Sequence, residues 1–190
     1  MFKTYLQLGF EHILDINAYD HVLFVIALCA VYSYKDWKKI LILVTAFTIG
    51  HSVTLALSAL KIVVFPADVI EFLIPLTIFL TAIFNISMHK ETKSMVRLNY
   101  LLALFFGWIH GLGFSNFFKA LMGPDESIIG PLFSFNLGVE LGQIIIVGLT
   151  VIIGYFFFQR LKTPLREWNL FISGAAAGIA MILMMEAKFW

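Results

Sequence analysis

The stretch "ILILVTAFTIGHSVTLALSAL", residues 40–60, decides the fold of this chain. It holds no aspartate, glutamate, lysine or arginine, and a helix of about 20 such residues crosses a hydrocarbon core of about 30 Å. The stretch therefore predicts a membrane-spanning helix. Its one histidine, His51, would lie near mid-membrane, where lipid offers an imidazole no hydrogen-bond partner. The rest of the sequence has to explain this histidine.

The composition of the whole chain agrees with a membrane protein. The 190 residues are 61% hydrophobic and 13% charged, with a mean hydropathy of +0.92. A soluble domain is about 45–50% apolar and about 25% charged. The formal net charge of +1 is too small to indicate a nucleic-acid-binding surface. The single cysteine, Cys29, has no partner in the chain and does not indicate a redox compartment.

Six apolar segments predict an all-α fold: a polytopic integral membrane bundle of six transmembrane helices, forming one membrane domain over residues 1–190. The runs are continuous rather than alternating, which disfavours a β-barrel, and helices satisfy the backbone in lipid. Residues 1–18 would form an amphipathic segment on the outer surface. The predicted spans are residues 19–34, 39–60, 67–88, 98–119, 131–158 and 168–187.

Basic residues predict the orientation of the bundle. Nine of the 13 lysines and arginines fall in the loops 34–39, 89–97 and 159–167. The positive-inside rule places these loops in the cytoplasm. With an even number of spans, both termini would then face the periplasm or cell exterior, in a multi-pass protein of the cell (inner) membrane. Glycine pairs at four-residue spacing, such as Gly107/Gly111 and Gly174/Gly178, indicate close helix packing. They leave a homo-oligomer open.

Ionisable residues recur at similar depths in these spans. His51 and His110 lie about midway along two of them, and Glu140 reaches a similar depth in a third. Glu71 is about one turn inside an outer end, and Asp20 and His21 open the first span. Such groups are costly in lipid and usually face the bundle interior. Imidazole with carboxylate suits a divalent first-row metal such as nickel, cobalt, zinc or iron. We therefore predict a metal site inside the bundle.

Uncharged polar residues extend this predicted site. Asn136 and Gln143 share one helix face with Glu140, at i, i+4 and i+7. Hydroxyl groups flank His51, and an amide lies toward the cytoplasm; these candidate lining residues are Thr45, Thr48, Ser52 and Asn85. A structural interpretation stays open, because back-bonding to the helix and interhelical hydrogen bonds also account for such groups.

The residues alone leave three functions open. The sequence contains no phosphate-binding loop, no HExxH and no cysteine pair, so we predict no catalytic residue, and a transporter is favoured over an enzyme. The first hypothesis is a permease that moves a divalent metal inward. The second is an intramembrane zinc-dependent hydrolase that uses the same histidines and carboxylate. The third is an assembly partner whose polar groups only hold helices together. Lipid and a metal ion are the expected partners.

Five blocks of the sequence together resemble the HupE/UreJ family of membrane proteins. They are "GFEHILDINAYDHVLFVIAL" (9–28), "TAFTIGHSVTLALS" (45–58), "VIEFLIPLTIFLTAIFN" (69–85), "HGLGFSNFF" (110–118) and "FNLGVELGQ" (135–143). The resemblance implies a nickel or cobalt permease. It also implies that His12, Asp20 and His21 take part in metal uptake at the outer side, and that His51, Glu71, His110 and Glu140 occupy family motif positions. Seven residues separate His12 from the Asp-His pair, where the family pattern leads us to expect five.

Overall fold

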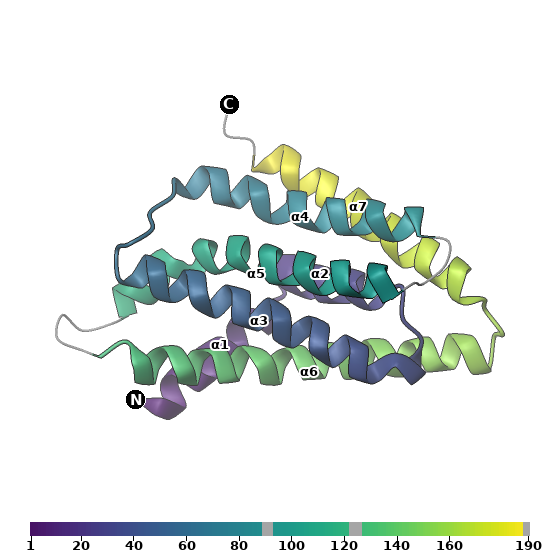
Figure 1. The fold of residues 1–190 in the computed structure, drawn as a ribbon, viewed down its shortest axis with the longest axis horizontal. Coiled ribbons are helices and arrows are strands. Elements are labelled where there is room, and N and C mark those ends of the chain that lie inside the picture. Colours follow the sequence, from purple (N-terminus) through teal and green to yellow (C-terminus); the bar gives the residue numbers. More distant parts are fainter. Residues whose placement is uncertain (89–92, 122–126, 188–190) are drawn as a thin grey trace.

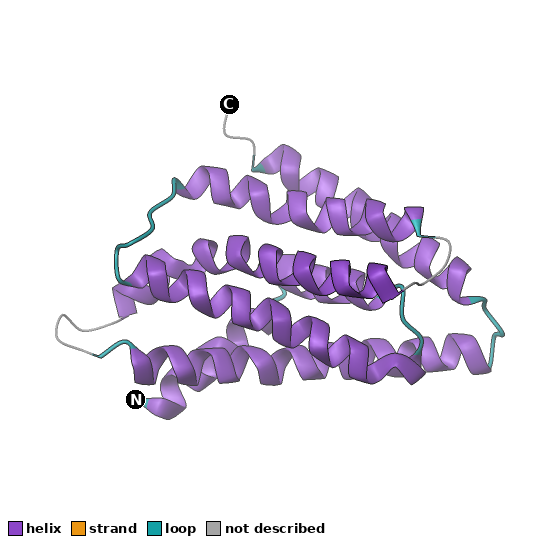
Figure 2. Ribbon diagram, in the orientation of Figure 1, coloured by secondary structure: helices purple, strands orange, loops and turns teal. Residues whose placement is uncertain are grey.

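A computed structural model describes residues 1–88, 93–121 and 127–187, and these residues form helices without a strand (Figures 1 and 2). The prediction of an all-helical chain is therefore confirmed. The elements are α1 (Phe2–Leu14), α2 (Asp20–Cys29), the short 3-10 helix η1 (Tyr34–Asp36), α3 (Trp37–Ala59), α4 (Ala67–Ser87), α5 (Lys93–Leu121), α6 (Ile129–Gln159) and α7 (Leu165–Glu186).

The long helices run up and down through one bundle. The first residues of α3, α5 and α7 and the last residues of α4 and α6 lie at the same end, on the right in Figure 1. The described basic residues of the three predicted cytoplasmic loops therefore gather at this end. Lys90 and Lys188 lie outside the described residues. Which side of the membrane this end faces remains a prediction, and we call it the basic end.

The predicted first span differs from the observed helix. α2 has ten residues, so it is about 15 Å long and too short to cross a core of about 30 Å. It begins beside the middle of the bundle and leads to Tyr32, whose hydroxyl accepts a hydrogen bond from Asn99 near the start of α5. Five helices, from α3 to α7, are long and apolar enough to span a membrane. Five of the six predicted spans thus have membrane-spanning length.

The N-terminal helix α1 packs lengthwise against the first half of α6. Glycines allow the close approach, because a Cβ at Gly9 would overlap the carbonyl oxygen of Phe135 and one at Gly138 would overlap that of Leu6. Tyr5 and Ile13 of α1 are buried. The segment predicted to lie on the outer surface is thus a helix of the bundle, and its depth relative to lipid stays a prediction. This packing carries His12 to the level of His51.

A second close contact joins α3 and α5, which run parallel. A Cβ at Gly107 would overlap the carbonyl oxygen of Phe47, and one at Gly111 would overlap that of His51. This contact sets His51 and His110 on neighbouring helices. Gly174 and Gly178 differ, because a Cβ there would meet no atom within 4 Å. Close packing within the bundle, which we expected for every glycine pair, does not account for these two.

Candidate metal site

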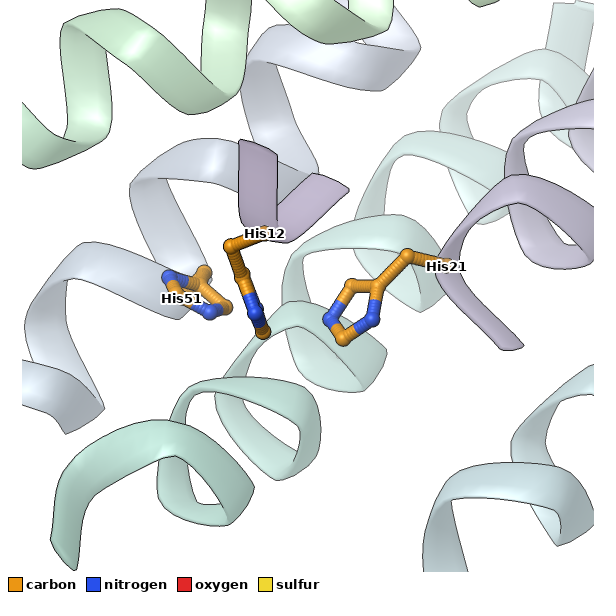
Figure 3. Close-up of side chains that lie close together, drawn as sticks. All are labelled: His12, His21 and His51. Carbon is orange, nitrogen blue, oxygen red and sulfur yellow. The ribbon is translucent and has the colours of Figure 1, made fainter. Parts of the chain in front are cut away.

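Three histidines from three helices meet inside the bundle (Figure 3). His12 lies near the end of α1, His21 at the start of α2, and His51 in the middle of α3. One ring nitrogen from each lies within 4.8 Å of the other two. Two metal–nitrogen bonds on opposite sides of an ion span about 4.2 Å, so small side-chain movements would bring the three nitrogens onto one ion. We call these residues the three-histidine cluster.

The nitrogens of this cluster are buried and unpaired. Nε2 of His12, Nε2 of His21 and both ring nitrogens of His51 have no hydrogen-bond partner. His51 is fully buried and His21 is 4% exposed. A buried polar atom without a partner costs about 1–3 kcal/mol, and several together call for an explanation. A bound cation would supply the missing partner.

Asp20 holds His21 in a fixed orientation. The Nδ1–H of His21 donates to Oδ1 of Asp20 at 2.8 Å, and the same oxygen accepts from the backbone N–H of His21 at 2.7 Å. With Nδ1 occupied, Nε2 is the nitrogen left for the cluster. Carboxylate–histidine–metal arrangements of this kind orient the ring and raise its basicity. Asp20 thus fixes the orientation of the His21 ring, and metal binding by Asp20 itself stays a prediction.

His12 lies among aromatic and imidazole rings. Its ring centroid is 4.1 Å from that of Phe114 and 4.6 Å from that of His21. Burial, together with the positive charge that His21 and His51 would carry, lowers the pKa of His12 well below its usual range. His12 is therefore a neutral imidazole near neutral pH, which is the form that binds a metal.

His110 borders the cluster but is partly occupied. Its ring lies 5.0 Å from that of His21, and its Nε2 is 3.0 Å from Oγ1 of Thr77. The Thr77 hydroxyl donates to the carbonyl of Ile74, so it accepts from Nε2–H of His110. The lone pair of His110 Nδ1 is left unpartnered and buried.

Two polar side chains of α6 contact α3 between the cluster and the basic end. Glu140 Oε1 accepts from the Thr45 hydroxyl at 2.5 Å, and Gln143 Oε1 accepts from Thr48 at 2.8 Å. Asn136 donates to its own helix at the carbonyl of Leu132. Ser52 likewise back-bonds within α3, to the carbonyl of Thr48.

Two cavities flank the loop between α1 and α2. One, of about 300 Å³, is lined by Asp20, Glu71 and Glu186, among others. The other, of about 650 Å³, is lined by His12, Glu11 and Asp15 beside Phe114. Both combine carboxylates with a residue of the cluster or with the aspartate that supports it. They give the cluster two acidic approaches.

Asn85 belongs to a different polar group. Its side-chain amide donates to the backbone carbonyl of Ala27 in α2 at 2.8 Å. The backbone carbonyl of Asn85 accepts from the side chain of Asn169 in α7, also at 2.8 Å. Ser173 completes the group by donating to Asn169 Oδ1 at 2.8 Å. Asn85 joins α2, α4 and α7, and its place along an ion path stays a prediction.

The structure regroups the residues that the sequence singled out. Rather than an outer set at His12 and His21 and a central set at His51, His110 and Glu140, it brings His12, His21 and His51 together. His110 adjoins them, Glu140 contacts α3, and Glu71 lines one of the two cavities. Sequence reasoning missed Thr77 and Glu186. The only sequence signal for Thr77 was its position two residues after Pro75, on the helix that carries Glu71.

Comparison with known proteins gives one match. The model of the family described as "HupE / UreJ protein" matches residues 1–190, the whole chain. Comparisons with curated proteins and with solved structures returned no match.

Proposed function

The chain belongs to the HupE/UreJ family, and from this premise we propose that it is a permease that carries a divalent transition-metal ion, nickel or cobalt, inward across the membrane through the three-histidine cluster. One observation carries the proposal. Three buried nitrogens from three helices lie within 4.8 Å of one another, and none has a hydrogen-bond partner. Hydrogen bonding between helices, the structural alternative, leaves these nitrogens without a role.

The ion would arrive through the acidic cavities beside the loop between α1 and α2. Carboxylates in a cleft with low-dielectric walls raise the local concentration of cations. Glu71, Glu186 and Asp20 supply this charge on one side, and Glu11 and Asp15 on the other. His12 and the Asp20–His21 pair connect the two cavities to the cluster.

The ligand set suits transport of a transition metal. Imidazole binds nickel, cobalt, zinc and iron, and hard cations such as magnesium prefer oxygen. Transport needs binding strong enough to admit the ion and weak enough to release it. Three imidazoles meet this need better than a thiolate cage, and the one cysteine, Cys29, is buried elsewhere in the bundle.

An intramembrane zinc hydrolase would use the same three imidazoles with an open fourth position. Family membership supports transport over this alternative. The two functions make different demands, because a hydrolase holds its metal through turnover and a permease must pass it on. Net movement of the ion therefore separates them.

Uptake of radioactive nickel, cobalt, zinc and iron into proteoliposomes tests the proposal. The parent chain should accumulate at least one of these ions, and His21→Ala and His51→Ala should reduce uptake to background. His89→Ala is the matched control, because His89 lies outside the predicted spans and should be dispensable. If the parent moves none of the four ions, or if His21→Ala and His51→Ala transport as it does, the permease proposal fails.

A further inference from the structure

A polar seam joins α3 and α6 on the side of the three-histidine cluster that faces the basic end. On α3 it consists of Thr45, Thr48 and His51, at i, i+3 and i+6. On α6 it consists of Asn136, Glu140 and Gln143, at i, i+4 and i+7. Two hydrogen bonds cross it, Thr45 to Glu140 at 2.5 Å and Thr48 to Gln143 at 2.8 Å. The spacing on α6 puts its three side chains on one helix face. On α3, Thr48 and His51 are buried, whereas Thr45 and its contact with Glu140 are exposed.

The hydrogen bonds across the seam are incomplete. Oε2 of Glu140, Oδ1 of Asn136 and Nε2 of Gln143 are buried and have no partner. Gln143 is fully buried. In lipid each such atom carries a desolvation cost, which a seam used only to join helices would avoid by pairing every group. The Glu140 and Asn136 atoms are oxygens that can coordinate a cation. The Gln143 Nε2–H can donate a hydrogen bond to the Glu140 carboxylate or to a water molecule bound to the ion.

His51 belongs to both the cluster and the seam. Both of its ring nitrogens are buried and unpartnered, and only one of them is needed for the three-histidine cluster. Figure 3 shows one nitrogen on the side of His12 and the other on the far side of the ring. The His51 imidazole can therefore bind an ion in the cluster through one nitrogen while its other nitrogen stays free for a ligand in the seam.

The seam extends toward the basic end. Thr45 precedes His51 by six residues on α3, which is about 9 Å along the helix axis. The start of α3 lies at the basic end, so the Thr45–Glu140 contact is closer to that end than the cluster is. For this half of the path the sequence offered few candidates, chiefly Thr45 and Asn85.

Resting on the proposed function, we propose that Glu140 and Asn136, with the second nitrogen of His51, form a separate inner station for the same divalent ion. The ion would leave the three imidazoles and enter a site richer in oxygen. Nickel and cobalt bind oxygen less tightly than nitrogen, so the inner station is weaker and favours release. The carboxylate balances part of the ion's charge where water is scarce.

Titration of the purified protein with Co²⁺, followed by calorimetry and by cobalt absorption, tests the station. The parent should show a tight event and a weaker event. Glu140→Gln keeps the shape and an acceptor for Thr45, so it should fold. It should lose the weaker event, keep the tight one, and lower cobalt influx into proteoliposomes by about tenfold or more, a loss in the range found when a group that supports a metal site is removed.

Two variants serve as controls. Glu167→Gln changes an exposed carboxylate in the first turn of α7 and should leave both events unchanged. His21→Ala should remove the tight event, and its failure to do so would count against the three-histidine cluster without touching the inner station.

Three results would overturn the inner station. They are a parent with one binding event, a Glu140→Gln variant that keeps the weaker event whatever its influx, and a Glu140→Gln variant that loses both events while its thermal unfolding is unchanged. The first two would leave Glu140 as a group that holds α6 to α3. The third would merge the seam with the cluster into one site.

Discussion

Two buried polar groups in this bundle differ in one respect, the completeness of their hydrogen bonds. In the group of Asn85, Asn169 and Ser173, the side-chain amides donate to backbone carbonyls and the Ser173 hydroxyl donates to Asn169, all at 2.8 Å. In the cluster of His12, His21 and His51, four ring nitrogens have no partner. Both groups contain buried side chains, so burial alone does not separate structure from function. The unpaired atoms do.

The comparison also separates the helices that each group joins. The asparagine group connects α2, α4 and α7, whereas the histidine cluster connects α1, α2 and α3. α2 takes part in both: Ala27 is tied to Asn85, and His21 faces the cluster. A short helix held at one end by complete hydrogen bonds can hold a ligand steadily at its other end.

The largest effect is expected from removing one imidazole of the cluster. Structural zinc sites gain about 10–16 kcal/mol from about four ligands, so His51→Ala should weaken metal binding by about 100-fold or more. Calorimetric titration with Ni²⁺ measures this loss. The stability of the metal-free protein should fall only by the cost of the cavity that truncation leaves, about 2–5 kcal/mol for a buried side chain, because the His51 nitrogens have no hydrogen bond to lose. A fall in stability well beyond that range without metal would place His51 with the structural group.

A bulkier side chain between α1 and α6 should disturb the cluster from a distance. Gly9→Val would overlap the carbonyl of Phe135 and push α1, with His12, away from His51. Overpacking costs about 1–3 kcal/mol, which corresponds to roughly 5- to 150-fold in nickel affinity if all of it falls on binding, and nickel uptake should fall with it. Gly174→Val is the matched control, because a Cβ there meets no atom within 4 Å. Equal uptake by both variants would mean that the position of α1 does not matter.

Loss of the group that orients His21 should have an intermediate effect. Asp20→Asn keeps the size of the side chain and removes the carboxylate that accepts from Nδ1 of His21. Groups that support metal ligands typically contribute about 10–100-fold to affinity, so we expect nickel affinity to fall toward the lower end of that range. Asp68→Asn, at an exposed aspartate in the first turn of α4, is the control. An Asp20→Asn loss as large as that of His21→Ala would argue that Asp20 is itself a ligand.

Much of the fold followed from the sequence because lipid imposes simple rules. Apolar runs predicted α3 to α7, whose observed bounds lie within a few residues of the predicted spans except at the start of α5, Lys93 rather than 98. Residues 19–34 differ more, because the apolar run "HVLFVIALCAVY" predicted a membrane span and the structure has a ten-residue helix there. Hydropathy measures the environment of a segment, and it does not distinguish a span from a short helix buried among other helices.

The site was harder to predict than the fold. Depth along each predicted span placed His51 and His110 together, but depth alone does not say which face of a helix meets which neighbour. The place of His12 depended on α1 entering the bundle, and that depends on glycine contacts with α6 which no single segment reveals. The resemblance to the family pointed to His12 and His21 at the outer side and to His51 as a further motif position, and the bundle geometry brings the three together.

For the group of Asn85, Asn169 and Ser173, whose hydrogen bonds are complete, we expect a loss of stability without a loss of metal binding. Asn169→Ala removes a donor to Asn85 and an acceptor from Ser173. Interhelical hydrogen bonds in membranes contribute about 0.6 kcal/mol on average and up to about 1.7, so the free energy of unfolding should fall by roughly 1–2 kcal/mol. Nickel affinity should stay within about twofold of the parent, in contrast to the histidine variants. An Asn169→Ala variant with normal stability and lost uptake would reverse the assignment of the two groups.

The smallest change in stability should come from the boundary between the two classes, at His110. Its Nε2–H is paired with Thr77, like an atom of the complete group, and its Nδ1 is unpaired, like an atom of the cluster. Thr77→Val keeps the shape and removes the acceptor, so stability should fall by about 0.6 kcal/mol and nickel affinity by only a few-fold. Thr81→Val is the control, because the Thr81 hydroxyl back-bonds to the Thr77 carbonyl within α4. If Thr77→Val abolished nickel binding, His110 would have to be counted as a fourth ligand whose ring Thr77 orients, and the cluster would extend into α5.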